Sequence, residues 1–146
     1  VAFARAEELA VAEREDESRR LARLRARLER GVLERVPEAA VNGAGAPRLP
    51  NTTNLRFAAL EGEALLIALD LAGFAVSSGA ACSSGAVEPS HVLTAIGLPR
   101  PAARASLRFS LGRGNTEAQV DALVEAVAAA AAHLRRLSPE WASDAR

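Results

Sequence analysis

The sequence predicts a small α+β domain in which three short strands alternate with about four helices. Segments 53–57 and 106–111 alternate apolar and polar residues, as half-buried strands do. Segments 1–36 and 116–136 instead repeat apolar residues at helical spacing. The 146 residues are enough for one domain with a core of its own. We therefore expect residues 1–146 to form a single domain.

The first predicted element is a long helix over residues 1–36. Leu21, Leu24 and Leu28 lie on one face of it, and Pro37 ends it because proline lacks an amide hydrogen. A helix this long usually projects from a body or bridges two bodies. The chain also begins with valine in a segment that is already helical in character. We therefore expect it to be part of a longer protein.

The middle of the chain predicts two strands and a helix. A turn-rich stretch over 41–47 precedes the strand at 53–57. An apolar helix follows over 63–72, and Gly73 is placed to end it in a left-handed conformation. Residues 74–76 are then a short strand candidate.

A loop rich in glycine, serine and alanine over 77–85 separates this region from the last elements. Pro89 suits the first turn of a helix that runs to about residue 96. The strand at 106–111 comes next, with Arg108 among its polar positions. Thr116 and Gln119 have the spacing of a capping box at the start of the last helix.

Composition excludes several classes of function. The net charge is zero, so nothing indicates electrostatic binding of nucleic acid or of an anionic membrane. No apolar run is long enough to cross a bilayer, and no metal-ligand set is predicted. The single cysteine excludes an internal disulfide and suits a reducing cytosol, so we expect a cytoplasmic protein.

The cationic residues carry a second exclusion. All 18 of them are arginines, so the chain has no lysine. Enzymes that bind pyridoxal phosphate covalently need a lysine amine. The chain by itself therefore cannot hold that cofactor covalently.

Cys82 lies in the small-residue loop, between Gly79 and Gly85. Few bulky apolar side chains anchor residues 77–86, and low packing implies a low free-energy cost of opening. This composition favours an exposed thiol on a loop that can move. The alternative is a cysteine that fills a gap in a tight turn, which is the commoner role of a lone cysteine.

Four stretches together resemble the cysteine desulfurases of the NifS and IscS type. They are the loop and following helix start at 77–93, the strand segment 106–113 with 115–117, the segment 49–57, and the closing segment 134–139. The resemblance covers essentially the whole chain. It implies the C-terminal small domain of a fold-type-I pyridoxal-phosphate enzyme, similar to class V aminotransferases and homodimeric. The large domain that holds the cofactor on a lysine is absent from this chain.

The resemblance also implies roles for two residues. Cys82 attacks the sulfur of cofactor-bound L-cysteine, becomes a persulfide and passes sulfur to an acceptor or scaffold protein for iron–sulfur clusters or tRNA thiolation, leaving L-alanine. Arg108 binds the substrate carboxylate, which a guanidinium can grip through two parallel hydrogen bonds. The alternative for Arg108 is a surface salt bridge of about 0–1 kcal/mol. His91 has no obvious partner for acid–base catalysis and is expected to be structural, as is His133 unless it is exposed.

Two other readings stay open from the sequence. One is a non-catalytic module that relays sulfur or binds a partner protein. The other is the small domain of a related class V enzyme, such as an aminotransferase or a selenocysteine lyase. In every reading, the chain alone is expected not to release sulfur from L-cysteine.

Overall fold

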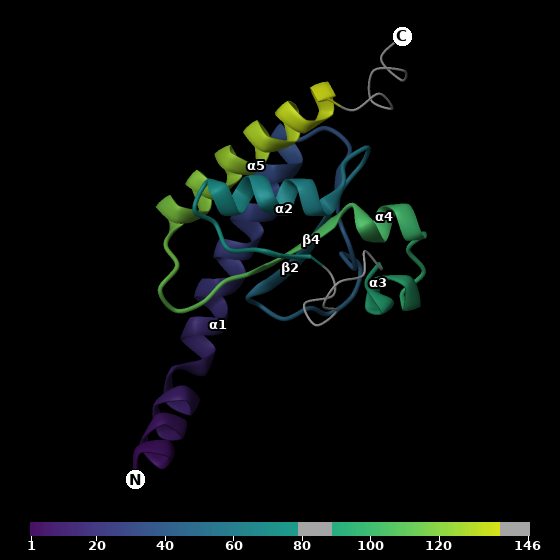
Figure 1. Ribbon diagram of the computed structural model, residues 1–146. Helices are drawn as coiled ribbons and strands as arrows, with labels where there is room; N and C mark the ends of the chain where they lie inside the picture. Colours follow the sequence, from purple (N-terminus) through teal and green to yellow (C-terminus); the bar gives the residue numbers. More distant parts are fainter. Residues whose placement is uncertain (79–88, 138–146) are drawn as a thin grey trace.

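The computed structural model describes residues 1–78 and 89–137 of the chain. An antiparallel four-stranded sheet, in the order β1-β2-β4-β3, packs against helices (Figure 1). The strands are β1 (Ala39–Val41), β2 (Thr52–Phe57), β3 (Ser77–Ser78) and β4 (Ser106–Ser110). The long helices are α1 (Ala2–Arg35), α2 (Gly62–Leu71) and α5 (Glu117–Leu137), and the short ones are α3 (His91–Ala95) and α4 (Arg100–Arg104).

The core lies between one face of the sheet and the three long helices. Leu55 and Phe57 of β2 and Leu107 and Phe109 of β4 are buried on this face, because alternate residues of a strand point the same way. The helices add apolar stripes at the predicted spacing: Leu21, Leu24, Leu28 and Val32 of α1, Leu65 and Leu69 of α2, and Val120, Leu123, Val124, Val127 and Ala131 of α5. The first half of α1 extends away from this body (Figure 1).

The α+β class is confirmed, but the described part of the chain has four strands where the sequence predicted three. Strand β1 was missed, because three residues are too few to show alternation. The segment 74–76 is not a strand. Gly73 adopts φ +86° and ends α2, and the amide of Phe74 still donates to the carbonyl of Leu69 (2.9 Å) in the helix C-terminal motif. The chain therefore joins the sheet only at β3.

The predicted helix over 89–96 is shorter than expected, and a second short helix follows it. Helix α3 begins at His91 rather than Pro89. Gly97, with φ +91°, ends it. Pro99 forms the N-cap of α4, where its missing amide hydrogen costs nothing.

The start of α5 confirms the predicted capping box. The amide of Thr116 donates to Oε1 of Gln119 (3.1 Å), and the amide of Gln119 donates to Oγ1 of Thr116 (3.3 Å). At the other end, Arg135 is buried and donates to the carbonyl of Ala58 (3.1 Å), which ties the last turn of α5 to the residue after β2. No helix in the described ranges combines the length and apolar character that a bilayer span requires.

Candidate active site

The face of the sheet opposite the core is polar and carries the predicted substrate-binding residue. Its strand residues are Thr52, Asn54 and Arg56 of β2, Ser77 of β3, and Ser106, Arg108 and Ser110 of β4. Asn42, one residue beyond β1, joins this polar face through its bonds to Asn54. No residue of the four described strands is acidic. The polar face therefore presents two guanidinium groups and no strand carboxylate.

Arg108 lies in the middle of this face and is exposed. Its register partners are Asn54 on β2 and Ser77 on β3, so its side chain stands between theirs. Nη2 of Arg108 donates to Oγ of Ser77 at 3.4 Å, which is long for a hydrogen bond. A guanidinium has five N–H donors, and the contact with Ser77, the one that Arg108 makes within 1–78 and 89–137, uses only one of them.

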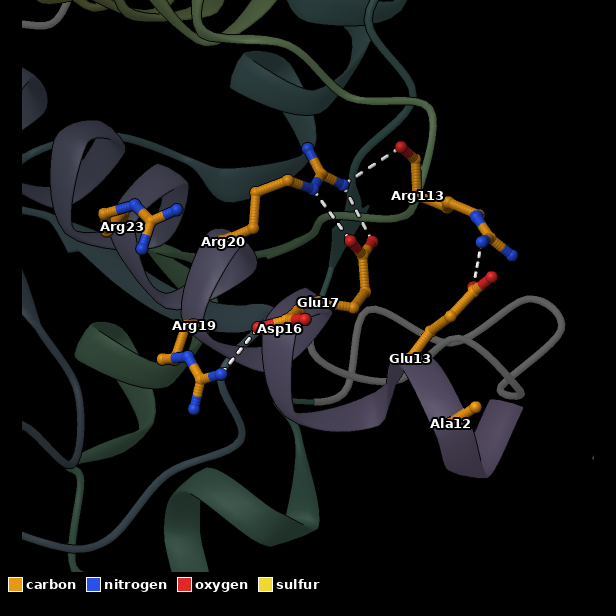
Figure 2. Close-up of a pocket in the computed structure, with 8 residues that line it drawn as sticks. All are labelled: Ala12, Glu13, Asp16, Glu17, Arg19, Arg20, Arg23 and Arg113. Atoms are coloured by element: carbon orange, nitrogen blue, oxygen red, sulfur yellow. Dashed lines mark hydrogen bonds and ion pairs between the residues drawn. The ribbon is translucent and has the colours of Figure 1, made fainter. Parts of the chain in front are cut away.

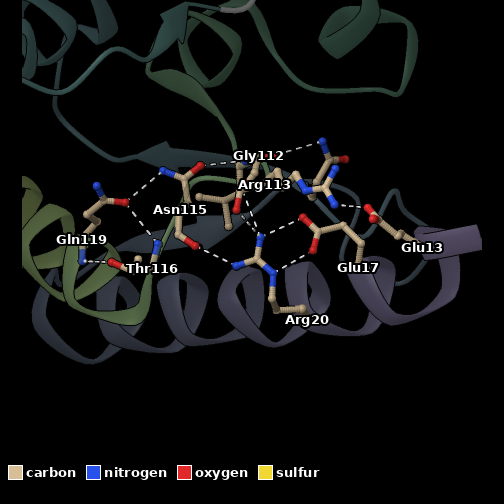
Figure 3. Close-up of polar contacts among 10 residues, drawn as sticks. Glu13, Glu17, Arg20, Gly112, Arg113, Asn115, Thr116 and Gln119 are labelled. Atoms are coloured by element: carbon tan, nitrogen blue, oxygen red, sulfur yellow. Dashed lines mark hydrogen bonds and ion pairs between the residues drawn. The ribbon is translucent and has the colours of Figure 1, made fainter. Parts of the chain in front are cut away.

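The end of β4 is fastened to α1 by Arg20, as Figure 3 shows. Its guanidinium donates to the carbonyls of Asn115 (2.7 Å), Arg113 (3.0 Å) and Gly112 (3.2 Å), and pairs with Glu17 (2.8 Å). The hydrogen bond from Arg20 holds the pKa of the Glu17 carboxyl below its usual value. This anchor was not predicted from the sequence. It fixes the turn that follows β4, the strand that carries the predicted substrate-binding arginine.

A hollow of about 450 Å³ lies beside this anchor, between α1 and the turn after β4 (Figure 2). Its charged groups pair with one another: Arg113 with Glu13, and Arg19 with Asp16 at 2.5 Å. Because three of the four arginines that line the hollow already pair with its three carboxylates, we assign the hollow a structural role in holding the turn against α1.

A network of buried and half-buried polar side chains occupies the neighbouring part of the polar face. Asn42 is buried, and its Nδ2 donates to Oδ1 of Asn54 (2.6 Å) and to Oγ of Ser106 (3.0 Å). Arg56 donates from Nη1 to Oδ1 of Asn42 (2.9 Å). Oγ of Ser106 donates to the carbonyl of Ala102 in α4 (2.7 Å). Asn42 and Arg56 were not predicted as site residues from the sequence. The signals that could have indicated them are a polar residue directly after a strand, for Asn42, and an arginine at an alternating strand position, for Arg56.

Of the two predicted site residues, Cys82 and Arg108, the structure describes only Arg108. Cys82 lies within 79–88, outside the described residues. Arg108 is on the polar face beside Ser77, and β3 is the strand from which the chain enters that segment. His91 is exposed at the start of α3, and His133 is exposed on α5, where its Nδ1 contacts Arg136 (3.3 Å).

The donor set of this chain does not fit a covalently held pyridoxal phosphate. The chain contains no lysine, and arginine cannot replace a lysine amine because its guanidinium stays protonated. Over residues 1–78 and 89–137, no group of three or more histidine, cysteine, aspartate or glutamate side chains is arranged to hold a metal ion.

Comparison with known proteins places the chain in a family. Residues 2–123 match the model of the family described as Aminotransferase class-V. The chain is 48% identical over 136 residues to a cysteine desulfurase of Gluconacetobacter diazotrophicus, covering 93% of this chain and 34% of that protein. It is 45% identical over 130 residues to the cysteine desulfurase NifS of Azotobacter vinelandii, covering 89% of this chain and 32% of that protein.

Solved structures agree with the sequence relatives. The X-ray structure of a NifS-like protein from Rickettsia africae superposes with a TM-score of 0.76 at 30% identity, over 88% of this chain and 32% of that one. The chain thus spans about a third of the length of the relatives it matches.

Proposed function

Because this chain belongs to the class-V aminotransferase family, we propose that it is the C-terminal small domain of a longer cysteine desulfurase, here called the full-length protein. The observation that carries the proposal is the position of Arg108. It stands exposed on a face without strand carboxylates, next to the strand that leads into the segment with the only cysteine. The identity with proteins named cysteine desulfurase supports it further.

Arg108 is proposed to bind the carboxylate of L-cysteine. A guanidinium and a carboxylate form two parallel charge-assisted hydrogen bonds, which fix orientation as well as charge. The position on β4 supports this role, because a strand held at its end by Arg20 fixes the backbone from which the Arg108 side chain projects. The salt-bridge alternative receives no support from the strands themselves, which offer Arg108 no carboxylate.

Cys82 is proposed to accept the sulfur. A thiolate is the soft nucleophile that sulfur transfer requires, and the chain has one cysteine. Its thiolate attacks the substrate sulfur, an S–S bond forms and the substrate C–S bond breaks. The electron pair of that bond stays with carbon, which takes a proton to give L-alanine. Cys82 follows Ser78 by four residues, so chain length limits the distance between their Cα atoms to about 14 Å.

The remaining requirements fall on parts of the protein beyond this chain. Pyridoxal phosphate, which the family relationship implies, is proposed to be held by a lysine of the large domain. We also propose that the full-length protein is a homodimer in the cytoplasm and that it passes sulfur to an acceptor or scaffold protein, for iron–sulfur clusters or tRNA thiolation.

The test uses the full-length protein with pyridoxal phosphate and L-cysteine. We expect equimolar alanine and persulfide in the first turnover, and mass spectrometry of the protein should find one added sulfur atom on Cys82. Cys82→Ser should abolish sulfur release, because an alcohol is a far weaker nucleophile toward sulfur than a thiolate.

The matched control is Ser83→Ala, which changes the neighbouring residue and leaves the thiol. It should retain turnover. Full activity of Cys82→Ser, or the absence of any alanine from the unmodified protein, would contradict the proposed function.

A further inference from the structure

The hydrogen-bond network on the polar face fixes the orientation of the Asn42 amide from two independent sides. Arg56 can only donate, so the atom of Asn42 that faces it, 2.9 Å away, is the oxygen Oδ1. The single hydroxyl hydrogen of Ser106 is used on the carbonyl of Ala102, so Ser106 accepts from Asn42. Both constraints turn Nδ2 of Asn42 toward Ser106 and Asn54.

The orientation of Asn42 in turn fixes that of Asn54. Nδ2 of Asn42 is a donor, so the atom of Asn54 that it contacts at 2.6 Å is the acceptor Oδ1. The amide of Asn54 is planar, and its Nδ2 therefore points away from Asn42. On that side of the row stands Arg108, the register partner of Asn54 across β2 and β4.

The result is a row of four polar side chains across the sheet, in the order Asn42, Asn54, Arg108, Ser77. The outer members accept or donate within the row: Asn42 satisfies the oxygen of Asn54, and Ser77 accepts from Arg108. At the centre, the amide of Asn54 and the guanidinium of Arg108 are two donor groups carried by register partners on adjacent strands. Over the described ranges, neither strand supplies an acidic side chain between them.

We propose that Asn54 is the second donor of the anion site that Arg108 begins, and that Arg56 is a positioning residue which acts through Asn42. The ligand that this donor pair suits is a carboxylate, one oxygen of which Asn54 binds while Arg108 binds the other. The inference rests on the proposed function, because the carboxylate is that of the α-amino acid substrate and product.

The first experiment measures KM and kcat of the full-length protein for L-cysteine. Asn54→Ala removes the donor without adding charge, and should raise KM about tenfold with kcat little changed, since a hydrogen bond to a charged group is lost from ground state and transition state alike. Asn54→Asp keeps the acceptor for Asn42 but replaces the outward donor with an acceptor, and should raise KM further. Ser110→Ala, on the same face one row away, should leave both constants unchanged.

The second experiment tests the positioning role. Arg56→Met leaves Asn42 free to turn and should raise KM several-fold, whereas Arg56→Lys keeps a group that only donates and should restore most of the lost affinity. A merely structural role would instead lower thermal stability in both variants and leave the ratio of their KM values near one.

Binding of L-alanine and L-alaninamide separates this inference from the proposed function. Asn54→Ala should weaken binding of L-alanine and leave that of the amide, which lacks the carboxylate, unchanged. Turnover of L-cysteine with an unaltered KM in Asn54→Ala overturns the inference and leaves the function standing. If the unaltered full-length protein does not turn over L-cysteine, but Asn54→Ala weakens its carboxylate-dependent binding, the inference is supported and the proposed function is overturned. If the full-length protein shows neither turnover nor carboxylate-dependent binding, both the inference and the proposed function are overturned.

Discussion

At the scale of single residues, the surroundings of each arginine decide what it does. Arg20 donates to three backbone carbonyls and pairs with Glu17, whereas Arg108 makes, among the residues that the structure describes, one long contact, to Ser77. The residue with spare donors is the one suited to a ligand. An Arg-to-Lys change separates charge from geometry, because lysine keeps the charge but loses the planar pair of donors.

We therefore predict that Arg108→Lys raises KM for L-cysteine in the full-length protein about tenfold, and that Arg108→Gln raises it more. The lysine variant retains attraction to the carboxylate, and the glutamine variant retains only neutral donors. Steady-state kinetics at fixed ionic strength measures both. An unchanged KM in Arg108→Gln would assign the arginine to the surface instead.

Glu29 is the residue for which the structure predicts a pH dependence. Burial opposes ionisation of this carboxyl, but hydrogen bonds from Arg48 (2.7 and 3.3 Å), with the nearby Thr53 hydroxyl, hold its pKa below the ordinary value of 4.5. Because the pKa of Glu29 is lower in the folded state, its ionised carboxylate adds to the free energy of unfolding at pH values above the ordinary pKa. This contribution is lost as the pH falls through the folded pKa.

We predict that Glu29→Gln lowers the free energy of unfolding at pH 7 by about 2 kcal/mol, since Arg48 loses a largely buried partner. The variant should also lose less stability than the unaltered chain between pH 5 and about pH 3. Urea unfolding at several pH values measures both effects. Glu34→Gln, an exposed change on the same helix, is the control and should follow the unaltered chain throughout.

At the scale of elements, the crossing of α1 and α5 depends on a glycine. A Cβ atom at Gly31 would stand 2.9 and 3.0 Å from the two methyl carbons of Val124, closer than packed carbons approach. By intrinsic helix propensity alone, alanine at position 31 would be better than glycine by about 1 kcal/mol. Contact with the other helix reverses that expectation, because a β-branched valine cannot easily turn away.

We predict that Gly31→Ala lowers the free energy of unfolding by about 1 kcal/mol, the net of a packing cost and the gain in helix propensity. Val124→Ala removes the two methyl groups, so Gly31→Ala should raise the free energy of unfolding when it is made in the Val124→Ala background. A double-mutant cycle by urea unfolding gives the coupling. Gly45→Ala, where no atom lies within 4 Å, should be near neutral; a stabilised Gly31→Ala would show that the helices can separate at no cost.

What the sequence could predict follows from the length of each element and the range of its contacts. The long helices and strands β2 and β4 have enough residues for their periodicity to show. Strand β1 follows Glu38, whose φ of 56° redirects the chain so that β1 pairs with β2. No local sequence pattern predicts this change of direction. The same holds at the candidate site: alternation and resemblance indicated Arg108, but Asn42 gains its role from Ser106, 64 residues away.

At the scale of the whole molecule, the proposed function divides the chemistry between this chain and residues that the chain does not contain. This chain contributes one cysteine, and its 18 cationic side chains are all arginines. It also leaves apolar side chains of α1 uncovered: Phe3 is 83% exposed and Val11 62% exposed in the described part of the chain. The cysteine desulfurases that it matches are about three times as long as this chain.

This division predicts that the isolated 146-residue chain does not release sulfur from L-cysteine. Without lysine, its one primary amine is the α-amino group of Val1, so borohydride reduction after incubation with pyridoxal phosphate should label that group and no side chain. Peptide mapping by mass spectrometry locates the label, and amino-acid analysis measures alanine. The full-length protein under the same conditions is the control, and it should be labelled on a lysine of its large domain. Alanine production by the isolated chain would contradict the prediction, because it would mean that these residues release sulfur without the cofactor-binding lysine that the proposed function assigns to the large domain.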